Sequence, residues 1–105
     1  MAPLLSDDEV TRGLEGLDWT RQGDAIVTTV LRQDFAGALA FVNAVGELAE
    51  ARNHHPDIAI SWNKVTLTLT THDAGGLTLA DLDLAAAIDA IEEPGGPDAA
   101  DPLPA

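Results

Sequence analysis

Hydrophobic positions recur with regular periods over most of the chain. The apolar residues of the central stretch are spaced by three and four, at Phe35, Ala38, Leu39, Val42, Val45 and Ala49. This period predicts a helix with one buried face, beginning after an N-cap at Asp34 and ending near Arg52, because Pro56 blocks its continuation. Strict alternation of apolar and polar residues over 58–62 and 65–70 predicts strands of an antiparallel sheet with one covered face.

Two shorter helices are predicted from their first turns. Ser6 is a suitable N-cap, and Glu9 follows three residues later within an acidic first turn. Thr78 and Asp81 have the spacing of a second capping box. The apolar stripe of the helix that follows is formed by Leu84, Ile88 and Ile91.

A hairpin completes the set of elements. Residues 19–22 and 25–31 read as strands around a Gly23-Asp24 turn, with β-branched residues in the second strand. The order is then helix, two strands, helix, two strands, helix. We predict an α+β fold in which three helices pack on one face of a four-stranded antiparallel sheet. Because such a sheet leaves an edge open and buries a modest core, we also expect a homodimer or homotetramer.

Composition excludes several classes of function. Five Lys and Arg against 18 Asp and Glu give a net charge of −13, which argues against binding to nucleic acid or anionic membrane. The absence of Cys excludes disulfides, thiolate metal sites and Cys nucleophiles. Apolar runs are far shorter than the roughly 20 residues of a membrane helix, and no signal-peptide pattern opens the chain. A cytoplasmic protein is therefore expected.

The last residues differ in composition from the rest. Residues 93–105 are rich in Pro and Gly and contain three further acids, a composition that cannot bury enough apolar surface to offset its ordering entropy. We expect a folded domain over 1–92 and a disordered acidic tail over 93–105.

The three histidines are the candidates for chemistry. His54 and His55 follow the central helix, and His72 is expected to end the fourth strand. Glu50 precedes His54 by four residues, which on a helix would place them on one face. Histidine is the side chain best suited to proton transfer near neutral pH. Adjacent histidines at a helix C-terminus can equally be partners of the helix dipole or ordinary loop residues.

The sequence gives less support to metal binding, phosphate binding or nucleophilic catalysis. Glu50, His54, His55 and His72 could together bind a transition metal, but adjacent histidines diverge in most backbone conformations, and we expect no metal. No phosphate-binding loop or nucleophile elbow is present. Trp19 and Trp62 fit core or rim packing, and either could also form a flat wall for a planar ligand.

Several stretches of the chain together resemble the signature of the pterin-4a-carbinolamine dehydratases. They are 50–57 (Glu-Ala-Arg-Asn-His-His-Pro-Asp), 62–65 (Trp-Asn-Lys-Val), 67–73 (Leu-Thr-Leu-Thr-Thr-His-Asp), 76–78 (Gly-Leu-Thr) and Asp81. Upstream, Trp19, residues 24–26 and the Asp34-Phe35 pair also lie where that family has similar residues. The resemblance covers residues 5 to 91. The chain departs from relatives at Asn53, where several have Asp, and at Ile58, where an aromatic residue is frequent.

The resemblance implies an oligomeric enzyme with no cofactor that dehydrates 4a-hydroxytetrahydropterin to quinonoid dihydropterin, recycling the cofactor of aromatic amino acid hydroxylases. It implies that His54, His55 and His72 are the catalytic and pterin-contacting histidines. The residues that it implies line or support the pocket are Glu50, Pro56, Thr71, Asp73 and Trp19. We expect His54 to be the main acid/base group, His72 its partner and His55 a contact that orients the pterin. The alternative is a non-catalytic module of the same fold, either a pterin-binding regulator or a dimerisation cofactor for a homeodomain transcription factor.

Overall fold

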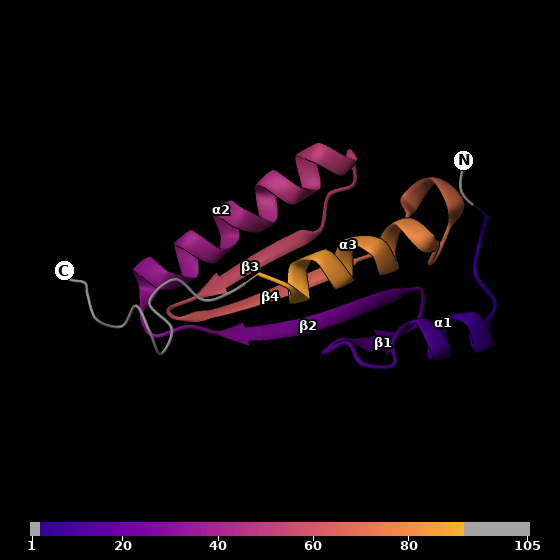
Figure 1. Ribbon diagram of the computed structural model, residues 1–105, viewed down its shortest axis with the longest axis horizontal. Helices are drawn as coiled ribbons and strands as arrows, with labels where there is room; N and C mark the ends of the chain where they lie inside the picture. Colours follow the sequence, from indigo (N-terminus) through magenta and orange to yellow (C-terminus); the bar gives the residue numbers. More distant parts are fainter. Residues whose placement is uncertain (1–2, 92–105) are drawn as a thin grey trace.

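The computed structural model describes residues 3–91 (Figure 1). Its elements are α1 (Asp7–Gly13), β1 (Thr20–Gln22), β2 (Ala25–Leu31), α2 (Phe35–Arg52), β3 (Asp57–Ser61), β4 (Lys64–Leu69), the 3-10 turn η1 (His72–Ala74) and α3 (Leu79–Asp89). All strand pairs are antiparallel, and the sheet has the order β1-β2-β4-β3. The predicted α+β architecture and element order are confirmed.

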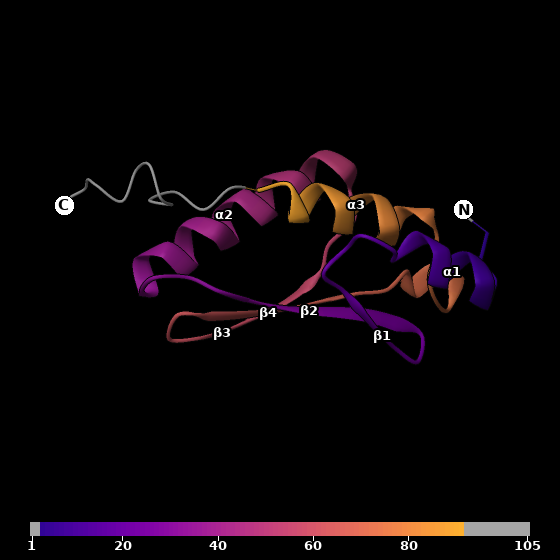
Figure 2. The same ribbon diagram turned by 60° about the horizontal axis from the view of Figure 1, so that its bottom comes forward.

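The helices lie on one side of the sheet (Figure 2). The alternation predicted for β4 decides which face they cover, since Val65, Leu67 and Leu69 are buried while the threonines between them are only partly covered. From the helix side, Phe41 and Val45 of α2 and the stripe of α3 complete the core. The predicted buried face of α2 is wrong at Phe35 and Leu39, which are 45% and 41% exposed, and it omitted Phe41, which is buried. Two layers around one apolar interior therefore hold the end of α2 close to the beginning of α3.

The predicted helix beginnings are confirmed in detail. At α1, the Glu9 backbone N–H donates to Ser6 Oγ over 3.1 Å, and Ser6 N–H donates back to Glu9 Oε1 over 2.8 Å. Asp34 caps α2 by accepting from the Gly37 N–H. Thr78 caps α3 with Asp81 as its capping-box partner. Side-chain oxygens thus satisfy backbone donors that each first turn leaves without an intrahelical acceptor.

Several predicted boundaries are wrong by a few residues. β4 ends at Leu69, so His72 does not end a strand; it opens η1, where the chain has already left the sheet. α3 ends at Asp89, which leaves Ile91 beyond the helix although it packs against the core. Trp62 is 66% exposed and belongs to the two-residue connection between β3 and β4, so it is not a core residue.

Trp62 also has an unfavourable backbone conformation. Its φ of 58° lies in the left-handed region, where a bulky residue is a genuine outlier. Because the side chain is largely exposed, little packing compensates the strain. We expect Trp62→Gly to raise the free energy of unfolding by about 1 kcal/mol, the usual cost of that region for an L-residue. Urea unfolding of the two proteins measures this directly, and a loss of stability would show that the indole makes stabilising contacts.

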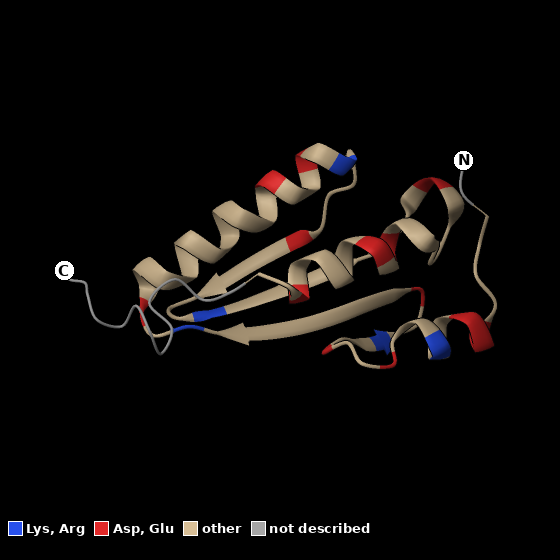
Figure 3. Cartoon of the chain, in the orientation of Figure 1, with Lys and Arg blue, Asp and Glu red and all other residues tan. Residues whose placement is uncertain are grey.

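The distribution of charged residues and the hydrophobicity of the helices bear on the possible surroundings of the protein. Acidic residues occur on all three helices, and the five basic residues are distributed over separate elements or loops (Figure 3). Within residues 3–91, no helix is both long and apolar enough to cross a membrane. The acidic tail expected over 93–105 lies outside the described residues.

Candidate active site

The end of α2 presents two of the histidines. Asn53 caps this helix in the left-handed conformation, with φ 50°, which Asn tolerates better than most residues. Its N–H donates to the carbonyls of Ala49 and Glu50, and the His54 N–H donates to Ala49 over 3.1 Å. The chain therefore turns sharply after Arg52, and the side chains of His54 and His55 leave the helix end in different directions.

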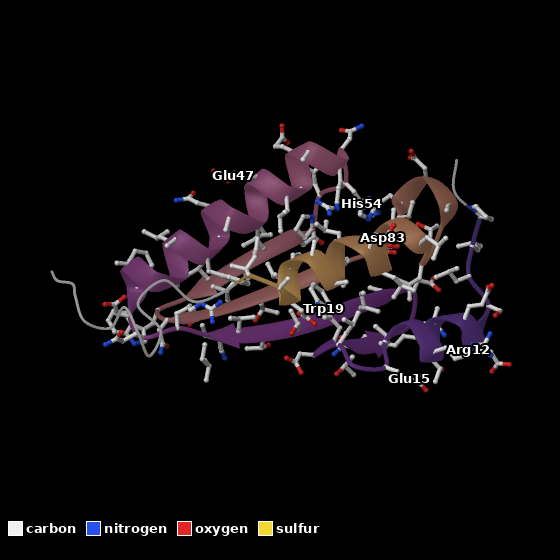
Figure 4. All side chains as sticks on the ribbon, in the orientation of Figure 1. Arg12, Glu15, Trp19, Glu47, His54 and Asp83 are labelled. Carbon is white, nitrogen blue, oxygen red and sulfur yellow. The ribbon has the colours of Figure 1, made fainter. Side chains whose placement is uncertain are left out.

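His54 is directed toward α3. Its Nε2 lies 2.6 Å from Oδ1 of Asp81, and the His54 side chain is 14% exposed while that of Asp81 is fully buried. Figure 4 shows His54 in the region between α2 and α3. A hydrogen bond this short between two groups withheld from water fixes the orientation of the imidazole ring.

Asp81 accepts further hydrogen bonds through its other oxygen. Oδ2 receives the Thr71 hydroxyl over 2.8 Å and the Thr78 backbone N–H over 2.9 Å. A carboxylate with these donors acts as an acceptor, so the network assigns the proton of the 2.6 Å contact to Nε2 of His54. In neutral His54, Nδ1 is then the ring nitrogen left to exchange a proton with a bound molecule.

His55 has a different partner. Its Nε2 lies 2.6 Å from Oε2 of Glu50, and both side chains are mostly exposed. The expectation that Glu50 shares a helix face with His54 is wrong, because α2 ends at Arg52 and the turn at Asn53 directs His54 elsewhere. The pair lies at the rim of the site, where exposure to solvent weakens the interaction.

The third histidine is held by a short closed loop. Thr71 and Gly76 form an isolated bridge, with the Thr71 N–H donating to Gly76 over 2.9 Å. Gly75 adopts φ 79°, a conformation that favours glycine and lets the loop close within six residues. The side chains of His72 and Asp73 are thereby placed at the surface of the loop, next to the end of α2.

These segments enclose one pocket of about 250 Å³. Its lining residues come from the α2 end and from the loop after β4, and they are Asn53, His54, His55, Thr70, Thr71, His72 and Asp73. All three histidines of the chain therefore meet at a single cavity, although they are up to 18 positions apart in sequence. Two other cavities of about 300 Å³ lie along β2, and no histidine lines either of them.

The remaining predicted site residues have various positions. Glu50 supports His55 from outside the lining, and Pro56 follows the histidines without lining the pocket. Trp19 is not brought to this pocket. It is buried in the core, where its indole N–H donates to Asp89 over 2.9 Å, and it lies across α3 from His54 in the view of Figure 4.

The arrangement suits proton transfer better than metal binding. Within residues 3–91, no group of three His, Asp or Glu side chains is placed to hold a metal ion, so Glu50 and the histidines do not form such a site. Three imidazoles around one cavity can instead supply both an acid and a base to a bound molecule.

Asp81 was predicted to be part of a capping box and matches the family signature, but no role in the site was predicted for it. A signal was available, because Asp81 precedes Leu84, Ala85 and Ile88 at the spacings of three, four and seven that define the buried face of α3. An acid on such a stripe must have buried partners. The sequence alone did not reveal that one of them is His54.

The fold and the pocket define a class of protein: a small α+β domain whose histidines converge at the end of its long helix. Sequence comparison identifies the family. The profile described as "Pterin 4 alpha carbinolamine dehydratase" matches residues 3–91, and the chain belongs to this family.

Individual relatives agree with this assignment. A protein of Roseiflexus castenholzii named "Putative pterin-4-alpha-carbinolamine dehydratase" is 58% identical over 92 residues, covering 87% of this chain and 99% of that protein. One of the same name from Nocardia farcinica is 53% identical over 89 residues, covering 84% and 94%. The crystal structure of a "transcriptional coactivator/pterin dehydratase" from Brucella melitensis superimposes with a TM-score of 0.78 at 30% identity, covering 82% and 95%.

Proposed function

We propose that this chain dehydrates a 4a-hydroxytetrahydropterin to the quinonoid dihydropterin and water, and so takes part in tetrahydrobiopterin recycling. The C4a–O bond breaks, the departing oxygen takes a proton, N5 loses its proton, and a C4a=N5 double bond forms. One proton is given and one is taken, and no electrons are exchanged with an outside partner. Residues able to act as general acid and general base are therefore sufficient.

The observation that carries the proposal is the convergence of His54, His55 and His72 on one pocket. The pocket has a volume of about 250 Å³, slightly below the range of about 300–1,000 Å³ that is usual for ligand pockets, and a pterin ring system is a small ligand. Membership of the dehydratase family supports the substrate class.

The proposed roles follow from the environment of each histidine. His54 is the main acid/base group, because the contact with Asp81 holds its ring and leaves Nδ1 for the substrate. His72 is its partner from the facing loop, and the exposed His55, held by Glu50, orients the pterin. Thr71 supports His54 through Asp81, while Asp73 lines the pocket. We retain Pro56 as a support of the histidine turn and Trp19 as a support of the core beneath α3.

A direct assay tests the function. A 4a-hydroxytetrahydropterin generated in situ dehydrates slowly by itself, and its decay is followed by ultraviolet absorbance with and without the protein. We expect catalytic acceleration proportional to protein concentration. Binding without acceleration would support the non-catalytic module, and the absence of both would contradict any pterin role.

We also propose that the chain forms a homodimer or homotetramer. β3 is an edge strand whose residues are mostly exposed, and its second residue, Ile58, is 39% exposed although Leu67, its partner on β4, is buried. An open edge with apolar side chains favours pairing with another chain. Sedimentation equilibrium at micromolar concentration is expected to give a mass of two or four chains, and the mass of a single chain would contradict the proposal.

A further inference from the structure

We infer that Thr78 is a positioning residue for the site, acting on His54 through Thr71 and Asp81. The inference rests on the proposed function for its kinetic consequence, but its structural consequence can be measured without any substrate. Thr78 does not line the pocket and is fully buried, and its ordinary task is to cap α3.

The direction of the hydrogen bonds is decided by counting protons. The Thr71 hydroxyl has one proton, which it donates to Asp81 Oδ2 over 2.8 Å. The 2.8 Å contact between the hydroxyls of Thr71 and Thr78 must therefore be donated by Thr78. Thr78 Oγ1 in turn accepts the Ala80 N–H over 3.2 Å. The chain of donors runs from the first turn of α3 through both hydroxyls to the carboxylate.

Thr78 reaches Asp81 by a second route as well. Its backbone N–H donates to the same Oδ2 over 2.9 Å. The carboxylate is thus held on one side by two donors that both depend on the position of Thr78, and its other oxygen faces His54 over 2.6 Å. Adjacent hydrogen bonds polarise one another in a buried network. Removing the Thr78 hydroxyl should therefore weaken the hydrogen bond between Asp81 and the imidazole ring of His54.

A capping residue without influence on the site would behave differently, and the chain offers a matched control. Ser6 caps α1 with the same reciprocal geometry, through Glu9, and neither residue lines the histidine pocket. Ser6→Ala and Thr78→Val should both lower the urea midpoint, because both remove a cap. Only Thr78→Val should change His54.

The experiment compares wild type, Thr78→Val, Thr78→Ser and Ser6→Ala in two readouts. Long-range ¹H–¹⁵N correlation spectra, recorded where the histidines are neutral, report the fraction of His54 protonated at Nε2. We expect this fraction to dominate in wild type, Thr78→Ser and Ser6→Ala, and to fall in Thr78→Val. In the dehydration assay we expect kcat of Thr78→Val to fall about tenfold with KM within about twofold, the equivalent of losing one hydrogen bond.

The outcomes separate the inference from the proposed function. If wild type shows no dehydration, the proposed function fails, while the tautomer spectra still decide the role of Thr78. If Thr78→Val retains both the wild-type tautomer and the wild-type kcat while losing stability like Ser6→Ala, Thr78 is a cap only and the inference is wrong. Should Thr78→Val not fold, neutron diffraction of the deuterated wild type decides between the two cases. The inference requires deuterium on Thr78 Oγ1, directed at Thr71, and deuterium on Nε2 of His54. Deuterium on Nδ1 of His54 alone would contradict the inference.

Discussion

Replacing His54 by alanine should lower the single-turnover dehydration rate by about 10²–10⁴-fold, the usual contribution of a positioned acid/base group. The reason is geometric. His54 is the pocket histidine whose ring is held from inside the protein, by a contact of 2.6 Å with a fully buried carboxylate. Among the pocket histidines of the described chain, only His54 contacts a buried carboxylate, so water or a flexible side chain would replace it poorly. Rapid mixing with excess enzyme measures the chemical step separately from product release.

His55→Ala is the matched control for this experiment. His55 is adjacent in sequence and lines the same pocket, but its partner Glu50 is exposed. We expect its loss to change KM more than kcat, because its proposed part is to orient the pterin. His72→Ala should resemble His54→Ala in the chemical step. Wild-type rates in all three alanine variants would contradict histidine catalysis altogether.

The second large effect is expected for Asp81→Asn. An amide has one acceptor oxygen, and the Thr71 hydroxyl and Thr78 N–H already require an acceptor at the Oδ2 position. The amide NH₂ must then face Nε2 of His54, which forces the imidazole into the other tautomer, with its proton on Nδ1. We expect kcat to fall by about 10²-fold or more, since a base in the wrong tautomer cannot take the substrate proton.

Stability must be measured alongside, because Asp81 is a structural residue too. The change should lower the free energy of unfolding by about 1–3 kcal/mol, the cost of disturbing a buried acceptor. Asp89→Asn is the control: Asp89 also lies on α3 and accepts two hydrogen bonds, from the Asp18 N–H and the Trp19 indole. It should lose stability but keep its dehydration rate within about twofold. Equal losses of rate in both variants would show that the effect of Asp81→Asn arises from destabilisation of α3.

Much of the fold could be predicted because local signals agreed. The spacing of apolar residues in α2, the alternation in β4 and the caps at Ser6, Asp34 and Thr78 depend on neighbours within a few residues. Strand ends were less predictable. His72 continues the alternation of the threonines, yet the bridge between Thr71 and Gly76 takes the chain out of the sheet.

The residues of the site could be predicted from the sequence, but the hydrogen bonds between them could not. Three histidines without another evident task, together with the resemblance to a dehydratase signature, named the residues of the pocket. The hydrogen-bond partners of these histidines could not be predicted from the sequence. Glu50 binds His55 rather than approaching His54, because a left-handed Asn53 ends the helix between them. Trp19 fits the family pattern, but its indole is used to join the segment before β1 to the end of α3.

The sequence by itself therefore determined the order of elements, the face of the sheet that is buried and the residue types available for proton transfer. These depend on periodicity and on short-range hydrogen bonds. Only the tertiary structure decided that Asp81, which the sequence shows as a helix cap, also holds His54 from 27 residues away. The physical reason is that a buried carboxylate takes its partners from whatever packing places next to it, and the packing of α3 beside the end of α2 is a property of the whole fold.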